Sequence, residues 1–349
     1  MPFGFRVARK LIIRSLPALM GFGILGAAAQ GLPALDDPDS APTAAPPALA
    51  VAAPATEMVA PALQALETQP QAELAPVEPA AGVQAAEAPA PWFPPGREPA
   101  IRSEFALVVD QDTNQVLMQK RADAVSSIAS ITKLMTAMVT LDAHLPLDED
   151  LQVTAAERTS IGWQTSALRP GVRVTRSQAL RLALMASENH AAQLLARTYP
   201  GGVQALVEAM NAKARELGMV DSNFADPTGL DPQNRASPND LVRMVKAAYA
   251  YPEIREYSVS TEFNLPMGKH VVRYHNTNHL TSHPGWQIGL QKTGYIEAAG
   301  RCLVMQAVIE GRRVVMVLLD SFGRYSRFAD AQRIRDWLSG QAVGARGRL

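Results

Sequence analysis

Three short motifs stand in a fixed order along this chain, and their chemistry requires the fold to bring them together. They are Ser130-Ile131-Thr132-Lys133 (S-x-x-K), Ser187-Glu188-Asn189 (S-x-N) and Lys292-Thr293-Gly294 (K-T-G). Together they supply a nucleophilic serine, two lysines, a second hydroxyl and a side-chain amide. These are the groups of a serine acyl-transfer site in which a lysine acts as the base.

The first motif supplies the candidate nucleophile and its base. A serine hydroxyl is unreactive at neutral pH until a base takes its proton. The pattern from Ser127 to Leu145 predicts a turn that leads into an apolar helix, so Ser130 lies near a helix N-terminus and Lys133 one turn later on the same face. Burial, and the positive charge of Lys292, are expected to lower the pKa of Lys133 so that its amine is neutral.

The other polar residues have distinct expected roles. Ser187 can relay a proton to the leaving amine, and Asn189 can orient Lys133 and bind a substrate amide. The backbone amides of Ser130 and Tyr295 form the expected oxyanion hole.

The third motif and the strand after it are suited to a substrate carboxylate. Lys292 and Thr293 give a cationic, hydroxyl-bearing edge, and Gly294 leaves room for close backbone approach. Arg301 is a candidate second carboxylate contact, or an ordinary arginine on a strand surface.

Charge and cysteine content narrow the classes of function. The net charge of zero gives no indication of nucleic-acid binding. Residues 15–96 contain no Lys or Arg and eight Asp or Glu residues, so the chain from Arg97 onward is mildly basic. A mildly basic surface favours binding of an anionic polymer, or it is an ordinary soluble surface. Cys302 is the single cysteine, so no intramolecular disulfide forms and a buried structural thiol is expected.

The N-terminal third divides into two segments that are not part of the folded unit. Residues 1–29 have the basic, apolar and small-residue regions of an export signal, which predicts a periplasmic protein with no stable membrane span after cleavage. An uncleaved anchor is the alternative. Residues 30–99 are rich in Ala and Pro and predict a disordered linker, either an extended tether or a plain spacer.

The rest is predicted to be a catalytic domain, residues 100–340, with a tail, 341–349. Periodicity and turn residues predict two early strands, a helical block, late strands and a closing helix. The strands are expected at 105–110, 115–118, 290–293, 300–310 and 313–320, and the helices at 127–145, 177–197, 203–217, 238–249 and 326–338. This order predicts an α+β fold, an antiparallel sheet flanked by helices with its first and last strands adjacent and a helical subdomain to one side. The site is then expected between the sheet and the helical block.

Four histidines in one segment raise the alternative of a zinc site. His270, His275, His279 and His283 are closely spaced, but Asn276-Thr277-Asn278 and His283-Pro284-Gly285 favour loops over a helix that could align two imidazoles. The sequence therefore indicates no metal and no other cofactor.

The motifs resemble those of the low-molecular-mass penicillin-binding proteins that act as D-alanyl-D-alanine carboxypeptidases and endopeptidases. The resemblance covers about residues 105–338. It includes the stretches 226–230, with Asn234, Ser237, Asp240 and Leu241, and 276–280. The stretches 289–295 and 299–305 look most like the endopeptidase branch.

This resemblance implies the fold of the penicillin-recognising serine enzymes (β-lactamase and DD-peptidase-like), with Ser130 acylated, Lys133 as base and Ser187, Asn189 and Lys292 completing the polar site. The implied substrate is the D-alanyl bond of a peptidoglycan cross-bridge between stem peptides, opened for wall growth and cell shape. Penicillins are implied as inhibitors that leave a slow acyl-enzyme.

Three alternatives follow from the same residues. A carboxypeptidase that trims a terminal D-alanine cuts at the same carbonyl and differs only in the leaving amine. A β-lactamase needs an additional group that activates water, and no segment clearly supplies one. A non-catalytic peptidoglycan- or penicillin-binding protein needs no nucleophile, so the intact motif residues argue against it.

Overall fold

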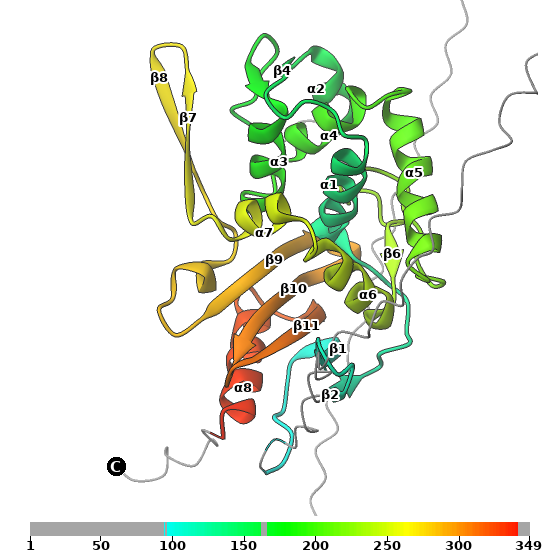
Figure 1. Ribbon diagram of the computed structural model, residues 1–349, viewed down its shortest axis with the longest axis vertical. Helices are drawn as coiled ribbons and strands as arrows, with labels where there is room; N and C mark the ends of the chain where they lie inside the picture. Colours follow the sequence, from blue (N-terminus) through cyan, green and yellow to red (C-terminus); the bar gives the residue numbers. More distant parts are fainter. Residues whose placement is uncertain (1–93, 95, 162–165, 341–349) are drawn as a thin grey trace, which may run out of the picture. The chain divides into compact units, whose positions relative to one another are not determined.

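A five-stranded antiparallel sheet separates a single C-terminal helix from a larger block of helices (Figure 1). The computed structural model describes residues 94, 96–161 and 166–340. The predicted export signal, most of the predicted linker and the predicted tail lie outside the described residues. Every helix and strand that it describes lies between Ser103 and Leu338.

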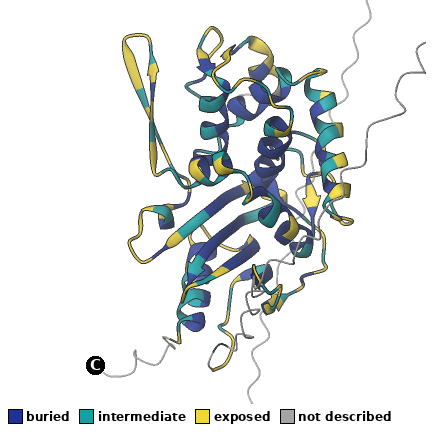
Figure 2. Cartoon of the chain, in the orientation of Figure 1, coloured by how far each residue is buried: buried dark blue, intermediate teal, exposed yellow. Residues whose placement is uncertain are grey.

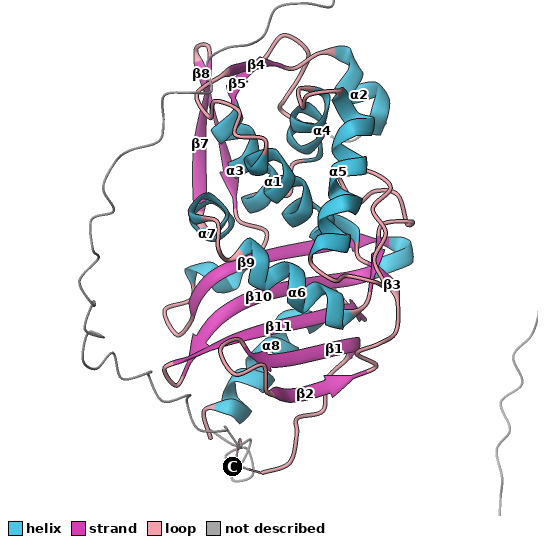
Figure 3. Cartoon of the chain, turned by 45° about the vertical axis from the view of Figure 1, so that its right-hand side comes forward, coloured by secondary structure: helices cyan, strands magenta, loops and turns pink. Residues whose placement is uncertain are grey.

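The main sheet has the strand order β2-β1-β11-β10-β9 (Figure 3). Its strands are β1 (Ser103–Asp110), β2 (Val116–Lys120), β9 (Gln287–Ile296), β10 (Gly300–Ile309) and β11 (Arg312–Ser321). β1 pairs antiparallel with β11, with Leu107 opposite Val317. This pairing confirms the predicted adjacency of first and last strands. β9 is an edge strand, so its outer backbone groups are free to face a cleft or a ligand.

Three short two-stranded sheets accompany it. They are β3 (Ser126–Ser127) with β6 (Arg235–Ala236), β4 (Asp150–Gln152) with β5 (Arg173–Thr175), and the hairpin of β7 (Glu262–Met267) and β8 (His270–His275). The β7–β8 hairpin extends beyond the other elements in Figure 1. It was not predicted, because its exposed strands lack a continuous apolar run.

Both faces of the main sheet are covered. Alternate residues of a strand point to opposite faces, so Leu107 and Val109 join the core beneath the helical block, while Ala106 and Val108 join the core beneath the C-terminal helix. This explains why the central strands are almost continuously apolar and appear dark blue in Figure 2.

The helices are α1 (Lys133–Asp142), α2 (Ala155–Ile161), α3 (Arg176–Met185), α4 (Asn189–Arg197), α5 (Gly202–Glu216), α6 (Pro238–Ala248), α7 (Pro252–Val259) and α8 (Ser326–Leu338). Short 3₁₀ turns occur at η1 (Ala129–Thr132), η2 (His279–Ser282) and η3 (Glu297–Ala299). No helix in the described part of the chain is both long and apolar enough to span a bilayer.

Helix α1 lies in the centre of the helical block. Its first eight residues, from Lys133 to Thr140, are all buried. A helix that is apolar on every side is enclosed on every side. The lysine at its first position is therefore buried with it.

The sequence predicted one helix from 177 to 197, and this was wrong. The structure contains two helices, α3 and α4, interrupted at Ser187, whose φ is +58°. Glu188 begins the second helix by accepting a hydrogen bond from the backbone N–H of His190 at 3.1 Å. A left-handed serine costs about 1–2 kcal/mol, so the break is imposed by surrounding structure, and it places the S-x-N motif in a turn.

Helix α8 is fixed to the sheet by the buried carboxylate of Asp330. It accepts hydrogen bonds from the backbone N–H of Ser103 at 2.8 Å, from the Ser103 hydroxyl at 2.7 Å and from the backbone N–H of Arg102 at 3.0 Å. Arg333 pairs with the same carboxylate. The start of β1 and the first turns of α8 are thereby held together.

Asp330→Ala is expected to reduce the free energy of unfolding by about 3 kcal/mol, because it leaves buried donors at Ser103 without an acceptor. The matched control is Asp336→Ala on the same helix. Its carboxylate accepts one hydrogen bond from Gln332, so its loss is expected to stay near 0.5 kcal/mol. Denaturant unfolding of both variants measures the difference, and equal losses would contradict the anchoring role.

Candidate active site

A cleft of about 340 Å³ lies between β9 and the helical block, and it brings the three motifs together. Its lining includes Ser130, Ser187, Asn189, Thr293, Gly294 and Tyr295 from the motifs and the residue after them, and Leu230, Thr277 and Arg327 from elsewhere. Ser130 and Ser187 are 57 residues apart in the chain, and Thr293 is a further 106 residues on. The cleft therefore lies where the sequence predicted it.

The turn that presents Ser130 is held by tight backbone packing. Ala129, the residue before it, has a left-handed φ of +48°. A Cβ placed on Gly229 would lie 2.0 Å from the Ala129 carbonyl oxygen and 2.8 Å from the Ser130 nitrogen. Only glycine fits at position 229, which also has a φ of +81°.

Gly294 permits a close, though less tight, approach from the sheet. A Cβ there would lie 3.1 Å from the Ser130 nitrogen and 3.0 Å from the Ala129 Cβ. The edge of β9 therefore packs directly on η1. This contact brings the backbone on either side of Gly294 beside the Ser130 amide, where the sequence predicted an oxyanion hole.

Three oxygen atoms surround the Lys133 amine. Its Nζ lies 2.9 Å from Ser130 Oγ, 2.6 Å from Asn189 Oδ1 and 2.6 Å from the Thr228 carbonyl oxygen. The amide oxygen and the carbonyl oxygen can only accept hydrogen bonds. When the amine is charged it donates to Ser130 Oγ as well; when it is neutral its two hydrogens suffice for these two acceptors, which leaves the lone pair for the Ser130 hydroxyl.

Burial is what lowers the pKa of Lys133. Its pKa falls from 10.5 to about 7 because the charged form loses water, although the carboxylates of Asp226 and Glu188 oppose the change. Burial was predicted from the sequence, and so was a contribution from the charge of Lys292, which is not among the causes of the lowered pKa of Lys133. The repulsion between the two amines is expressed instead in the lowered pKa of Lys292.

Lys292 and Ser187 form a second polar pair across the cleft. Lys292 Nζ donates to Ser187 Oγ at 2.8 Å and to the Thr293 carbonyl at 2.7 Å. Burial, followed by the positive charges of Lys133 and Arg327, holds the pKa of Lys292 well below its ordinary value. The two buried amines therefore disfavour each other's charge.

The loop before β6 has a supporting role that the sequence analysis did not assign. Asp226 accepts hydrogen bonds from the backbone N–H groups of Thr228 at 2.7 Å and Asp231 at 2.8 Å, and from the Asn234 side chain at 3.1 Å. This fixes the Thr228 carbonyl against Lys133 and Gly229 against the Ser130 turn. In the sequence, this stretch is marked only by the family resemblance.

Arg327 is the main cleft residue that the sequence analysis missed. It comes from the first turn of α8, and one guanidinium nitrogen donates to the Arg324 carbonyl at 2.8 Å. Its Nε is buried without a hydrogen-bond partner. Burial and the charge of Arg301 lower its pKa to about 10. A buried, incompletely paired guanidinium is a strong site for a carboxylate.

Arg301 lies next to the cleft but not in its lining. Its guanidinium stacks on Tyr295, 4.3 Å from the ring centroid. Thr293 is in the cleft, and its hydroxyl lies 2.6 Å from that of Thr277. Arg327, and not Arg301, is thus the guanidinium beside Thr293 in the cleft lining. Cys302 is buried, as predicted.

The four histidines are spread over several elements. His270 and His275 are on β8, His279 is in η2 and His283 follows it. His279 packs edge-on against Phe328, with ring centroids 4.4 Å apart. Among the residues that the structure describes, no three His, Cys, Asp or Glu side chains lie close enough to hold a metal ion.

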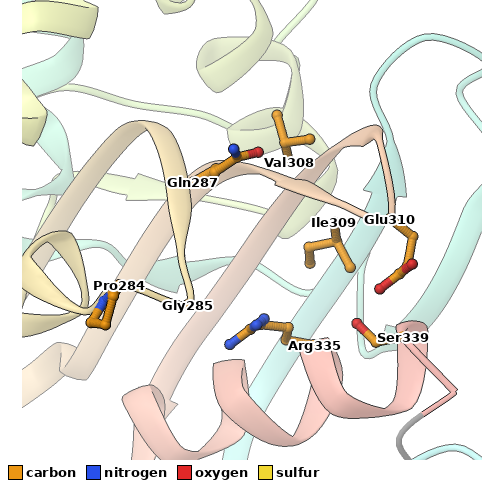
Figure 4. Close-up of a pocket in the computed structure, with 8 residues that line it drawn as sticks. All are labelled: Pro284, Gly285, Gln287, Val308, Ile309, Glu310, Arg335 and Ser339. Atoms are coloured by element: carbon orange, nitrogen blue, oxygen red, sulfur yellow. The ribbon is translucent and has the colours of Figure 1, made fainter.

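A second cavity, of about 260 Å³, lies at the other end of α8 (Figure 4). Arg335, Glu310 and Ser339 face it from α8 and the β10–β11 turn. It contains none of the motif residues, and its Arg335 guanidinium stacks on Trp286 at 5.3 Å. The chemistry of the motifs therefore belongs to the first cleft alone.

Comparison with known proteins identifies similar chains. The sequence model described as D-alanyl-D-alanine carboxypeptidase matches residues 94–323. The chain is 45% identical over 245 residues to the D-alanyl-D-alanine endopeptidase of Escherichia coli, covering 69% of this chain and 78% of that protein. It is 44% identical over 270 residues to the D-alanyl-D-alanine endopeptidase of Pseudomonas aeruginosa, covering 76% and 86%.

A solved structure shows the same fold. The D-alanyl-D-alanine carboxypeptidase from Mycobacterium tuberculosis is similar with a TM-score of 0.65 and 28% sequence identity, over 73% of this chain and 97% of that chain. This likeness confirms the fold class predicted from the sequence.

Gly229→Ala is expected to abolish acylation of Ser130 by a labelled penicillin and to cost at least about 3 kcal/mol of unfolding free energy, because the new Cβ overlaps the Ala129 carbonyl. Gly218→Ala is the matched control. Gly218 also has a positive φ, +70°, but no atom lies within 4 Å of its Cβ position, so the variant is expected to lose only about 1 kcal/mol and to be acylated normally. Similar behaviour of the two variants would show that the contact with the Ser130 turn does not matter.

The rate of penicillin acylation is expected to rise with pH and to level off, with a midpoint near the Lys133 pKa of about 7, because only the neutral amine can take the Ser130 proton. Glu188→Gln removes a carboxylate that raises this pKa, so its midpoint is expected at lower pH. Stopped-flow acylation between about pH 5 and about pH 9 measures both profiles. A rate that does not change over this range would exclude Lys133 as the titrating base.

Proposed function

Since the chain belongs to the D-alanyl-D-alanine carboxypeptidase family of serine peptidases, we propose that it is a DD-endopeptidase that hydrolyses D-alanyl cross-bridges of peptidoglycan through an acyl-enzyme on Ser130. The observation that carries this proposal is the Lys133 amine, buried, with a pKa of about 7, and 2.9 Å from Ser130 Oγ. A binding module has no need of an activated serine.

Acylation uses the groups around Lys133. Ser130 Oγ forms a bond to the carbonyl carbon of the D-alanyl residue while its proton passes to Lys133 Nζ. The carbonyl oxygen becomes an oxyanion, which the amides of Ser130 and Tyr295 stabilise. When the intermediate collapses, the C–N bond breaks and the proton from Lys133 reaches the leaving nitrogen through the Ser187 hydroxyl, which lines the same cleft.

Hydrolysis of the acyl-enzyme reverses these roles. Lys133, neutral again, takes a proton from a water molecule while the water oxygen bonds to the acyl carbon. The bond to Ser130 Oγ then breaks, and the oxygen recovers its proton from Lys133. The stem is released with a free D-alanyl carboxylate. The bonds formed and broken, and the protons moved, in the two steps together add up to the hydrolysis of one peptide bond.

The cationic end of the cleft selects substrates that have a carboxylate beside the scissile amide. Thr293 presents a hydroxyl there, and Arg327 presents a guanidinium whose Nε lacks a partner. A carboxylate bound between them also favours the charged form of Lys292. Penicillins place a carboxylate at the corresponding distance from a reactive amide, so they are proposed to acylate Ser130 as substrate mimics.

Both D-alanine carboxypeptidases and endopeptidases cut at this carbonyl. The endopeptidase assignment rests on similarity, since the two endopeptidases are 44–45% identical to this chain and the Mycobacterium tuberculosis carboxypeptidase is 28% identical. The carboxypeptidase activity is the alternative outcome of the experiment below.

The site of action is proposed to be the periplasm. The basic, apolar and small-residue regions of the first 29 residues support export, and the composition of the Ala- and Pro-rich segment that follows supports an extended spacer ahead of the enzyme. Opening of cross-links there would serve wall growth and cell shape.

Digestion of purified cross-linked muropeptide dimers by the Arg97–Leu349 fragment, with products separated by mass, tests the proposed function. Monomers are expected with the parent fragment and none with Ser130→Ala, because the variant has no nucleophile for the acyl-enzyme.

Two results would overturn the assignment. Loss of a terminal D-alanine with dimers left intact would make the enzyme a carboxypeptidase. Binding of dimers without any cleavage would favour a non-catalytic protein.

A further inference from the structure

One exposed aromatic side chain lines the cleft, and two more lie in the segment that leads to Arg327, which also lines it. Among the described residues, the exposed large hydrophobic side chains that are aromatic are Tyr295, Phe322 and Tyr325, with exposures of 55%, 85% and 60%. Tyr295 lines the cleft, and the other two lie in the segment between β11 and α8. Aromatic side chains left in water beside a site commonly mark a binding surface.

Two arginines without ion-pair partners accompany these rings. Arg301 stacks on Tyr295 at 4.3 Å, and Arg324 stacks on Tyr325 at 5.4 Å. The acidic residues closest to them in sequence are Glu297 and Asp320, and within the described ranges neither arginine pairs with these or any other carboxylate. We call Tyr295, Arg301, Phe322, Arg324 and Tyr325 the arginine–aromatic surface.

This surface continues from the carboxylate anchor of the cleft. Thr293 and Tyr295 are two residues apart on β9 and point to the same face of the sheet. On β10, Leu303 lies opposite Thr293 and Arg301 lies opposite Tyr295. Leu303 packs in the core beneath α8, so Arg301 and Tyr295 lie on that same face of the sheet. The charge of Arg301 also lowers the pKa of Arg327, which places the two guanidinium groups near each other.

We infer that the arginine–aromatic surface binds the peptide stem that carries the leaving amine of a cross-link. This inference rests on the proposed function and names the part of the substrate that a carboxypeptidase does not have. A terminal D-alanine ends at the carboxylate held by Thr293 and Arg327. In a cross-link, the chain continues past this carboxylate into a second stem, an acidic peptide with further free carboxylates, and the unpaired guanidinium groups of Arg301 and Arg324 complement it.

The inference separates two substrates that share the same scissile bond. One is the complete muropeptide dimer, and the other is a shortened cross-link whose leaving group is only the single amino acid that carries the leaving amine. Arg301→Gln is expected to lower kcat/KM for the complete dimer about tenfold, mainly through KM, the loss typical of one charge-assisted contact. The shortened substrate is expected to change by less than about twofold, because it does not reach the surface.

The matched control is Arg335→Gln. Like Arg301 and Arg324, Arg335 stacks on an aromatic ring and lacks an ion pair among the described residues, but it lies on α8 and faces the second cavity (Figure 4). The Arg335→Gln variant is expected to cut both substrates at the rate of the parent enzyme. Arg324→Gln is a second variant of the surface and is expected to show the same selective loss as Arg301→Gln. Labelled penicillin checks that each variant folds with an acylable Ser130.

The outcomes distinguish the inference from the proposed function. Equal losses on the two substrates, or no loss on either, would overturn the inference while leaving the endopeptidase activity intact. Failure of the parent enzyme to cut either substrate would overturn the proposed function itself. A selective loss on the complete dimer in both surface variants supports the inference.

Discussion

The enzyme depends on keeping one lysine amine out of water. Lys133 is the first residue of a helix that is buried on every side, and its amine is surrounded by Ser130, Asn189 and the Thr228 carbonyl. Burial of a charged ammonium is costly, so the group is driven toward its neutral form. The carboxylates of Asp226 and Glu188 limit this shift and keep the pKa near neutrality, where a base is most effective. The apolar sequence of α1 is therefore what brings the Lys133 pKa to about 7, as the proposed mechanism requires.

Keeping that amine aligned with the nucleophile requires three distant segments to meet without intervening side chains. Gly229 of the loop and Gly294 of β9 both pack against the Ala129–Ser130 turn. A Cβ on Gly229 would overlap the Ala129 carbonyl, and a Cβ on Gly294 would crowd the Ser130 nitrogen at 3.1 Å. Asp226 fixes the loop through several backbone N–H groups, and the loop in turn supplies the Thr228 carbonyl. Rigid backbone contacts of this kind hold reactive groups in place without help from the substrate.

Local sequence patterns predicted most of the sheet and α8, because strands that alternate across two buried faces and a helix with a clear end are strong local signals. They did not predict the break at Ser187, since α3 and α4 share a continuous helical pattern and only tertiary contacts impose the left-handed turn. The motifs correctly predicted that Ser130, Ser187 and Asn189 lie together, and the structure places them in one cleft with Lys133 and Lys292 hydrogen-bonded to them from below its lining. Arg327 was missed because it has no motif around it, and its importance comes from the fold, which buries its guanidinium beside Thr293. Burial was predicted as a cause of the lowered Lys133 pKa and is its largest cause, whereas the predicted contribution of Lys292 is not among the causes.

The positive charges of the cleft have a consequence for substrate selection. Lys133, Lys292 and Arg327 lie close enough that Lys133 and Arg327 both lower the pKa of Lys292. Two buried amines that repel each other cannot both be charged at low cost, so Lys133 and Lys292 compete for one proton. A carboxylate arriving between Thr293 and Arg327 favours the charge on Lys292, and that charge then disfavours protonation of Lys133. Under the proposed mechanism, a substrate with a carboxylate in this position therefore helps to keep its own base neutral, whereas an uncharged amide gains neither the ion pair nor the activated serine.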